Sequence, residues 1–99
     1  MSNLSHTNMK TFVVAGNKDQ AMTWIRNDIN KNATTTGIWK SLSDYIIVHR
    51  PEQIRGFSDP HGVFVGTWKA RADIKDIVEL LIVSSTTPNE SLINIRKDL

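Results

Sequence analysis

Two short runs of consecutive apolar residues constrain the fold of this chain more than any other feature. They are TFVVA at 11–15 and YIIV at 45–48, and both are rich in β-branched residues. A short apolar run without alternation is typical of a strand whose two faces are both covered. About 29 residues separate the runs, which is the length of a β-α-β unit. We therefore expect two parallel strands that are neighbours or near-neighbours.

The segment between these runs is expected to form a helix that packs one face on the sheet. Gly16 ends the first strand, and Asn17 is placed to cap the helix with Gln20 as its capping-box partner. Helical spacing of apolar residues continues as far as the polar letters KNATTTG, so the helix is expected to end near Asn30. Residues 31–44 lack a clear period and predict a loop with short local structure. The expected sheet-facing residues are Trp24, Ile25 and Ile29.

The second half of the chain predicts a short helix, a third strand and a longer helix. Pro51 suits the first position of the helix PEQIR, which Gly56 ends. Residues 63–65 predict a short strand, and Asp73 is placed to cap the helix that follows. The expected core stripe of that helix consists of Ile74, Ile77, Val78 and Leu81.

The C-terminal residues 86–99 are expected to form an ordered helical arm. Thr87 and Glu90 have the spacing of a capping box, and Pro88 falls at the first helical position. The apolar residues that follow are Leu92, Ile93 and Ile95.

The predicted order β-α-β-α-β-α gives a single α/β domain over residues 1–99. With right-handed crossovers, the strands form a small three-stranded parallel sheet with helices on its faces, a half-sized Rossmann-like unit. Residues 1–9 are polar and are expected to form a flexible tail.

Composition narrows the partners and the compartment. There are 12 Lys and Arg against 10 Asp and Glu, a net charge of +2 with no basic tract, so nucleic acid is not an expected partner. The absence of cysteine excludes disulfides, thiolate metal sites and a cysteine nucleophile, and it fits a reducing compartment. The first nine residues lack the apolar run of a signal peptide, and no run is long enough to span a membrane. We expect a cytoplasmic protein without a membrane partner.

Two glycine turns are expected at the carboxyl ends of the strands, where open parallel sheets bind ligands. The turn at 16–18 offers a glycine, free helix-terminal amides and a lysine. The turn at 66–69 offers a glycine, a hydroxyl, an indole and a lysine, which suit a phosphate with an attached base. Residues 49–50 fall at the same edge, and Arg55 could clamp a phosphate. The predicted ligand-binding residues are Gly16, Asn17, Lys18, Arg55, Gly66, Thr67, Trp68, Lys69 and Arg71.

Each of these features also has a purely structural explanation. A glycine between a strand and a helix commonly makes a tight turn, and Trp68 could cover the end of the sheet as part of the core. Arg55 could be a surface residue or pair with a carboxylate.

No catalytic residues, metal ligands or cofactor are predicted. His6, His49 and His61 lack the spacing of metal ligands with one another or with acidic residues. The serines lie outside any nucleophile-elbow motif, and no pair of carboxylates is placed across a cleft.

Between residues 11 and 83 the chain resembles a group of small phage-encoded α/β proteins. The matching segments include AGN at 15–17, PEQIRG at 51–56 and VGTW at 65–68. This resemblance implies a protein that sequesters nucleotide immune signals, a class that includes anti-CBASS proteins binding cyclic dinucleotides as homo-oligomers. The stretch TTTGIWKSLS and the residues after Ser85 depart from the resemblance.

Three hypotheses of function follow. The first is a non-enzymatic nucleotide-binding protein that sequesters a cyclic nucleotide signal in phage counter-defence. The second is a small enzyme acting on a nucleoside or nucleotide, since related sheets carry such chemistry. The third is a protein-interaction module that uses Leu80, Ile82 and Leu92. Surplus apolar residues at 80, 82 and 83 and the apolar C-terminal helix also predict a homo-oligomer.

Overall fold

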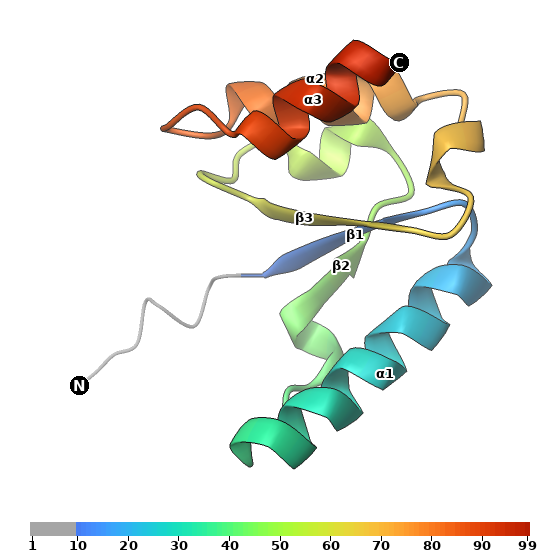
Figure 1. Cartoon of the computed structure of the whole chain (residues 1–99), viewed down its shortest axis with the longest axis vertical. Coiled ribbons are helices and arrows are strands. Elements are labelled where there is room, and N and C mark those ends of the chain that lie inside the picture. The colour runs from blue at the N-terminus through green and yellow to red at the C-terminus, as the bar shows by residue number, and fades with distance from the viewer. Residues whose placement is uncertain (1–9) are drawn as a thin grey trace.

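β1 (Thr11–Ala15) is the central strand of a three-stranded sheet in the computed structural model, which describes residues 10–99 (Figure 1). β2 (Tyr45–Ile47) lies on one side and β3 (His61–Val65) on the other, and both pair with β1 in parallel. After its first residue, β1 is at most 3% exposed. The predicted α/β fold with a small parallel sheet is confirmed, whereas the predicted tail at 1–9 lies outside the described residues.

Helices cover both faces of this sheet (Figure 1). α1 (Lys18–Thr36) lies on one face, and α2 (Ile74–Val83) and α3 (Glu90–Asp98) lie on the other. Because side chains alternate along a strand, β1 contributes to two separate apolar clusters. It gives Phe12 and Val14 to the α2-side cluster and Val13 and Ala15 to the α1-side cluster.

α1 is longer than predicted. It ends at Thr36 and not near Asn30, so the loop predicted at 31–44 is wrong over its first part. Within the polar run each threonine hydroxyl donates to the carbonyl four residues earlier, so its polar group is satisfied inside the helix. Gly37 then ends the helix with a left-handed φ of 74°. The three bonds run from Thr34 to Asn30 (2.6 Å), from Thr35 to Lys31 (2.8 Å) and from Thr36 to Asn32 (2.7 Å).

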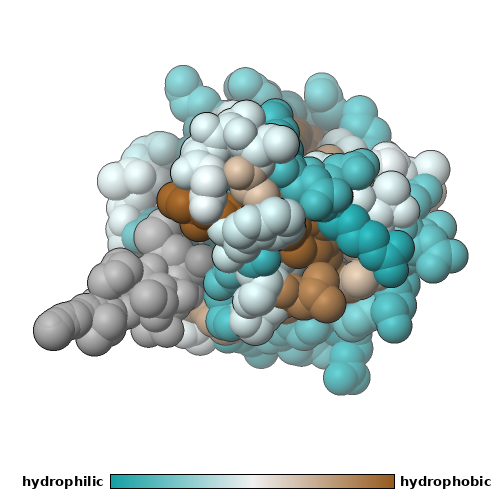
Figure 2. All heavy atoms as spheres, turned by 90° about the horizontal axis from the view of Figure 1, so that it is seen from below, coloured by the Kyte–Doolittle hydropathy of each residue, from teal (hydrophilic) through white to brown (hydrophobic). Residues whose placement is uncertain are grey.

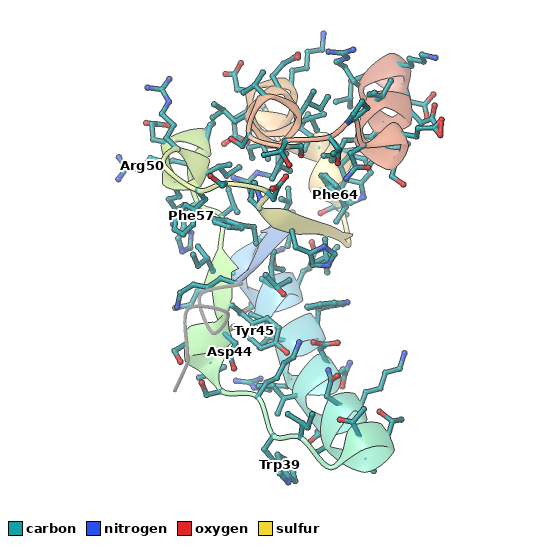
Figure 3. The ribbon with its side chains drawn as sticks, turned by 90° about the vertical axis from the view of Figure 1, so that its left-hand side faces the viewer. Trp39, Asp44, Tyr45, Arg50, Phe57 and Phe64 are labelled. Carbon is teal, nitrogen blue, oxygen red and sulfur yellow. The ribbon has the colours of Figure 1, made fainter. Side chains whose placement is uncertain are left out.

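The connection that follows α1 exposes apolar side chains at one end of the molecule. Ile38, Trp39 and Leu42 are 62%, 71% and 57% exposed. Figure 2 looks onto this end and shows apolar surface among polar residues. In Figure 3, Trp39 lies at the far end of the molecule and points away from it. The sequence had no clear period here, and the structure leaves these side chains without a core to join.

The shorter elements fall close to their predicted positions. β2 ends at Ile47, one residue before the predicted end of the strand, and β3 starts at His61, two residues before the predicted start. The predicted helix at Pro51 is a 3₁₀ segment, Pro51–Ile54, that contributes Ile54 to the α2-side cluster.

α2 buries the predicted stripe of Ile74, Ile77, Val78 and Leu81. The surplus apolar residues are mostly accounted for within the chain: Leu80 and Ile82 pack partly against the α2-side cluster, and Val83 stays 71% exposed.

The predicted capping box of α3 is wrong. Asn89 is the N-cap, and its side-chain oxygen accepts the amide of Leu92 at 3.2 Å. Asn89 sits directly before the helix with the required extended backbone, whereas Thr87 lies two residues too early. α3 packs on α2 through buried Leu92, so this arm belongs to the core.

Candidate functional site

A cleft of about 440 Å³ opens at the carboxyl ends of β1 and β2. Its volume is in the range of small-molecule sites, and its position is the one expected for an open parallel sheet. Three groups of residues line it. They are Gly16, Asn17 and Lys18 after β1, Val48 and His49 after β2, and Arg71, Ala72 and Asp73 between β3 and α2.

The first wall of the cleft is the start of α1. The Asn17 side chain accepts the amide of Gln20 at 2.9 Å, which confirms Asn17 as the N-cap. Among the described residues, no protein acceptor takes the amides of Lys18 and Asp19. The Lys18 amide and the exposed Lys18 ammonium make this wall locally positive, because the helix dipole has its positive end here; the exposed Asp19 carboxylate in the same turn lies outside the cleft lining.

Arg71 forms the opposite wall, and its guanidinium is fully engaged by the protein. Nη1 donates to the carbonyls of Ala15 (3.0 Å) and Val48 (2.7 Å), and Nη2 donates to the carbonyl of His49 (3.2 Å). Nε and Nη2 also pair with the two carboxylate oxygens of Asp73 at 2.9 and 3.1 Å. All five N–H groups of an arginine are thereby used. Arg71 therefore ties the ends of β1 and β2 to the start of α2.

The side chain of Gln20 lies between the two glycine turns that were predicted to bind a ligand together. Its Oε1 accepts the amide of Gly16 (3.0 Å), the amide of Thr67 (3.1 Å) and the Thr67 hydroxyl (3.3 Å). The sequence predicted a capping-box hydrogen bond between the Gln20 side chain and the backbone of Asn17. The Gln20 oxygen instead accepts from the amides of Gly16 and Thr67. The side-chain amide of Gln20 thus occupies the space between the two turns where an anion was expected.

The same bridge explains both glycines. A β-carbon on Gly16 would collide with the Thr67 hydroxyl, and one on Gly66 would collide with the Gln20 side chain. Gly66 also has a left-handed φ of 59°. Close packing between the two turns therefore requires glycine at both positions. No ligand is needed to explain these glycines.

Trp68 and Lys69 lie outside the cleft. The Trp68 ring is half-buried against the α2-side cluster, with its centroid 4.8 Å from that of Phe64. The Lys69 ammonium lies 5.5 Å from the Trp68 centroid, a cation–π contact. This tryptophan is thus part of the packing at the end of the sheet.

Arg55 does not line the cleft either. It borders a separate hollow of about 400 Å³ together with the acidic residues Glu52, Asp76 and Glu79. The structure therefore brings together four of the nine predicted residues, and it adds His49 and Asp73. His49 had been placed at this edge of the sheet, because it directly follows the predicted strand at 45–48, without being counted among the binding residues. The pairing of Gln20 with Thr67, 47 residues away, has no local sequence signal.

Within residues 10–99, no group of three or more His, Cys, Asp or Glu residues could hold a metal ion. In the same part of the chain, no helix has the length and apolar character needed to cross a membrane. Comparisons with protein-family models, curated proteins and solved structures gave no match. Inference about function therefore depends on the geometry of the cleft.

Proposed function

We propose that this protein binds a phosphorylated ligand of the nucleotide class in the cleft between the ends of β1 and β2, and holds it without chemical change. The observation that carries the proposal is the amide of Lys18, which has no acceptor among the described residues, beside the Lys18 ammonium in the lining of a 440 Å³ cleft. The start of a helix with a lysine beside it suits a phosphate group.

The remaining walls supply further contacts for such a ligand. His49 lies across the cleft and can donate a hydrogen bond or offer a ring face. The Arg71 guanidinium is largely balanced by Asp73, so it acts mainly by fixing the shape of the cleft. Selectivity for an anion therefore comes mainly from the α1 side.

The proposed biological role is sequestration of a cyclic nucleotide signal in phage counter-defence, as the sequence resemblance implies. A cleft of this volume fits a ligand of about the size of one nucleotide. A cyclic dinucleotide consists of two nucleotide halves, so we expect each cleft to hold one half of such a ligand.

A thermal-shift series with mono-, linear and cyclic dinucleotides tests this proposal. A ligand at 100 times its Kd stabilises the folded state by about 2.7 kcal/mol, a clear rise in Tm. Chromatography of the ligand after incubation should recover it intact. If no nucleotide raises Tm, the proposed function is wrong, and if the nucleotide is consumed, the protein is an enzyme.

Three charge-matched variants locate the site. Lys18→Ala should weaken binding by about tenfold, because a charge-assisted contact is worth roughly 1–2 kcal/mol. Lys31→Ala removes the same charge from an exposed position far along the same helix and should leave affinity unchanged. Arg55→Ala distinguishes the site predicted from sequence, which includes Arg55, from the cleft, which does not. It should leave affinity unchanged if the ligand occupies the cleft. Equal affinity of the Lys18 and Lys31 variants would overturn the placement.

A further inference from the structure

The two edge strands of the sheet differ in how many of their outward-facing backbone groups form hydrogen bonds. β2 has three residues, and the Gln53 side chain donates from Nε2 to the Ile47 carbonyl at 3.2 Å. β3 has five residues, and among the described residues its backbone forms no hydrogen bond outside its pairing with β1. Alternate backbone groups of a parallel edge strand point away from the sheet. The β3 edge therefore presents unpaired donors and acceptors.

β3 also lacks the features that protect edge strands. Its sequence, HGVFV, contains no lysine, carboxylate or proline, and its pairing with β1 runs without a bulge. Residues 62–65 are half-buried, although the neighbouring β1 is buried after its first residue. Figure 3 looks along the strands and shows β3 as the last strand of the sheet, with α3 above and α1 below. Such an edge is a template for pairing with another strand.

We propose that β3 joins two copies of this chain, the two β3 strands pairing antiparallel about a two-fold axis at Val63 to make one continuous six-stranded sheet. This inference does not depend on the ligand proposed above. A two-fold interface uses the same surface on both copies, so the surface must be complementary to itself.

The residue pattern of β3 meets that requirement. With Val63 on the axis, each Gly62 lies opposite the partner's Phe64, and each His61 lies opposite the partner's Val65. Gly62 has no side chain to collide with the partner's Phe64, although Leu81 of its own chain already lies 3.1 Å from the position of a Gly62 β-carbon. The valines at the axis form a β-branched cross-strand pair, and no charged residue meets a like charge within the strand.

The flanks of β3 carry opposite charges. Asp59 precedes the strand, where its carboxylate is held by the amide and hydroxyl of Thr86, and Lys69 follows the strand. With Val63 on the axis, antiparallel pairing puts Asp59 opposite the partner's Thr67, two residues from the partner's Lys69, so the flanks bring unlike and not like charges toward each other. This complementarity favours a second copy of the chain over an unrelated strand.

The sequence predicted an oligomer interface on the apolar residues of α2, whereas the interface proposed here is on β3. Leu80 and Ile82 already pack against the core of their own chain, which leaves Val83 as the one strongly exposed residue of that predicted surface. The apolar side chains of β3 also pack partly against their own core, so what β3 adds is an edge of backbone donors and acceptors without partners among the described residues.

Cross-linking gives a direct test, because the chain contains no cysteine. Val63→Cys places one thiol on the proposed axis, where Cα atoms of opposed residues in an antiparallel pair are about 4.5–5.5 Å apart, within disulfide range. Mild oxidation should give a covalent dimer. Val83→Cys, an exposed apolar position on α2, is the matched control and should remain monomeric. A dimer from Val83→Cys but not from Val63→Cys would overturn the proposal.

Light scattering of the unmodified chain gives the second readout. We expect a mass of twice the 11.2 kDa of one chain at micromolar concentration, and Val63→Lys should restore the monomer by placing like charges on the axis. Circular dichroism shows whether the Val63→Lys chain is folded. If it is unfolded, the cross-linking of Val63→Cys and Val83→Cys decides between dimer and monomer. A monomeric mass for the unmodified chain at all concentrations tested would overturn the proposal.

Discussion

At the residue scale, the most consequential side chain is Gln20. One oxygen holds the turns after β1 and β3 together through three hydrogen bonds. The sequence predicted that the Gln20 side chain would bind Asn17, but its oxygen binds Gly16 and Thr67 instead. The bond to Thr67 could not be predicted, because a contact between residues so far apart leaves no pattern in the chain between them.

Gln20→Ala should therefore destabilise the fold although the residue lies near the surface. The change leaves the amides of Gly16 and Thr67 without their acceptor, which costs about 1–3 kcal/mol. Urea unfolding followed by tryptophan fluorescence measures the difference. Asn27→Ala, on the same helix and exposed, is the control and should change stability by less than about 0.5 kcal/mol. Equal midpoints for the two variants would contradict the structural role of Gln20.

Tyr45 provides a prediction on pH. Burial and then the hydrogen bond to Asp28, at 2.6 Å, raise the pKa of Tyr45 well above its ordinary value, because both disfavour the phenolate. The folded state thus keeps the proton that the unfolded state loses. This contribution to stability is present below pH of about 10 and is lost progressively as pH rises further.

We expect the free energy of unfolding to fall more steeply above pH of about 10 in the unmodified chain than in Tyr45→Phe. Tyr45 is the single tyrosine, so absorbance titration reports this phenol alone. Ionisation at the ordinary tyrosine pKa in the folded protein would contradict the buried hydrogen bond.

At the element scale, α1 shows where periodicity and composition mislead. Asparagine and threonine are poor helix formers, so the polar run after Asn30 predicted an end. In the structure the threonine hydroxyls bond back within the helix, and the helix continues to the glycine. The stop signal at Gly37 was present in the sequence, but the polar run obscured it.

Gly37→Ala tests that stop. A β-carbon at this position meets no atom within 4 Å, so the cost comes from the left-handed backbone alone, about 1 kcal/mol. Gly37→Asn should cost less, because asparagine adopts this conformation more easily. Thermal unfolding followed by circular dichroism compares them. If alanine is tolerated as well as glycine, α1 does not end at this residue in solution.

At the scale of the whole molecule, the predictable features were those carried by contiguous stretches of chain. The apolar runs at 11–15 and 45–48 and the stripe of α2 predicted the parallel sheet and its covering helices. The candidate site was predicted in part, since the turn at 16–18 and Arg71 do line the cleft. Arg55 and the turn at 66–69 lie elsewhere, because their positions depend on how the crossovers pack, which no local pattern specifies.

The strand order has a consequence for how the chain acquires its structure. β1 is synthesised first, yet both of its partners lie far along the chain, and no two successive strands pair as a hairpin. Closing such long loops costs entropy before any strand contact compensates for it, which slows folding. During translation the apolar β1 segment leaves the ribosome long before β3 does. The nascent chain therefore carries an unpaired apolar strand through most of its synthesis, the kind of segment that chaperones shield.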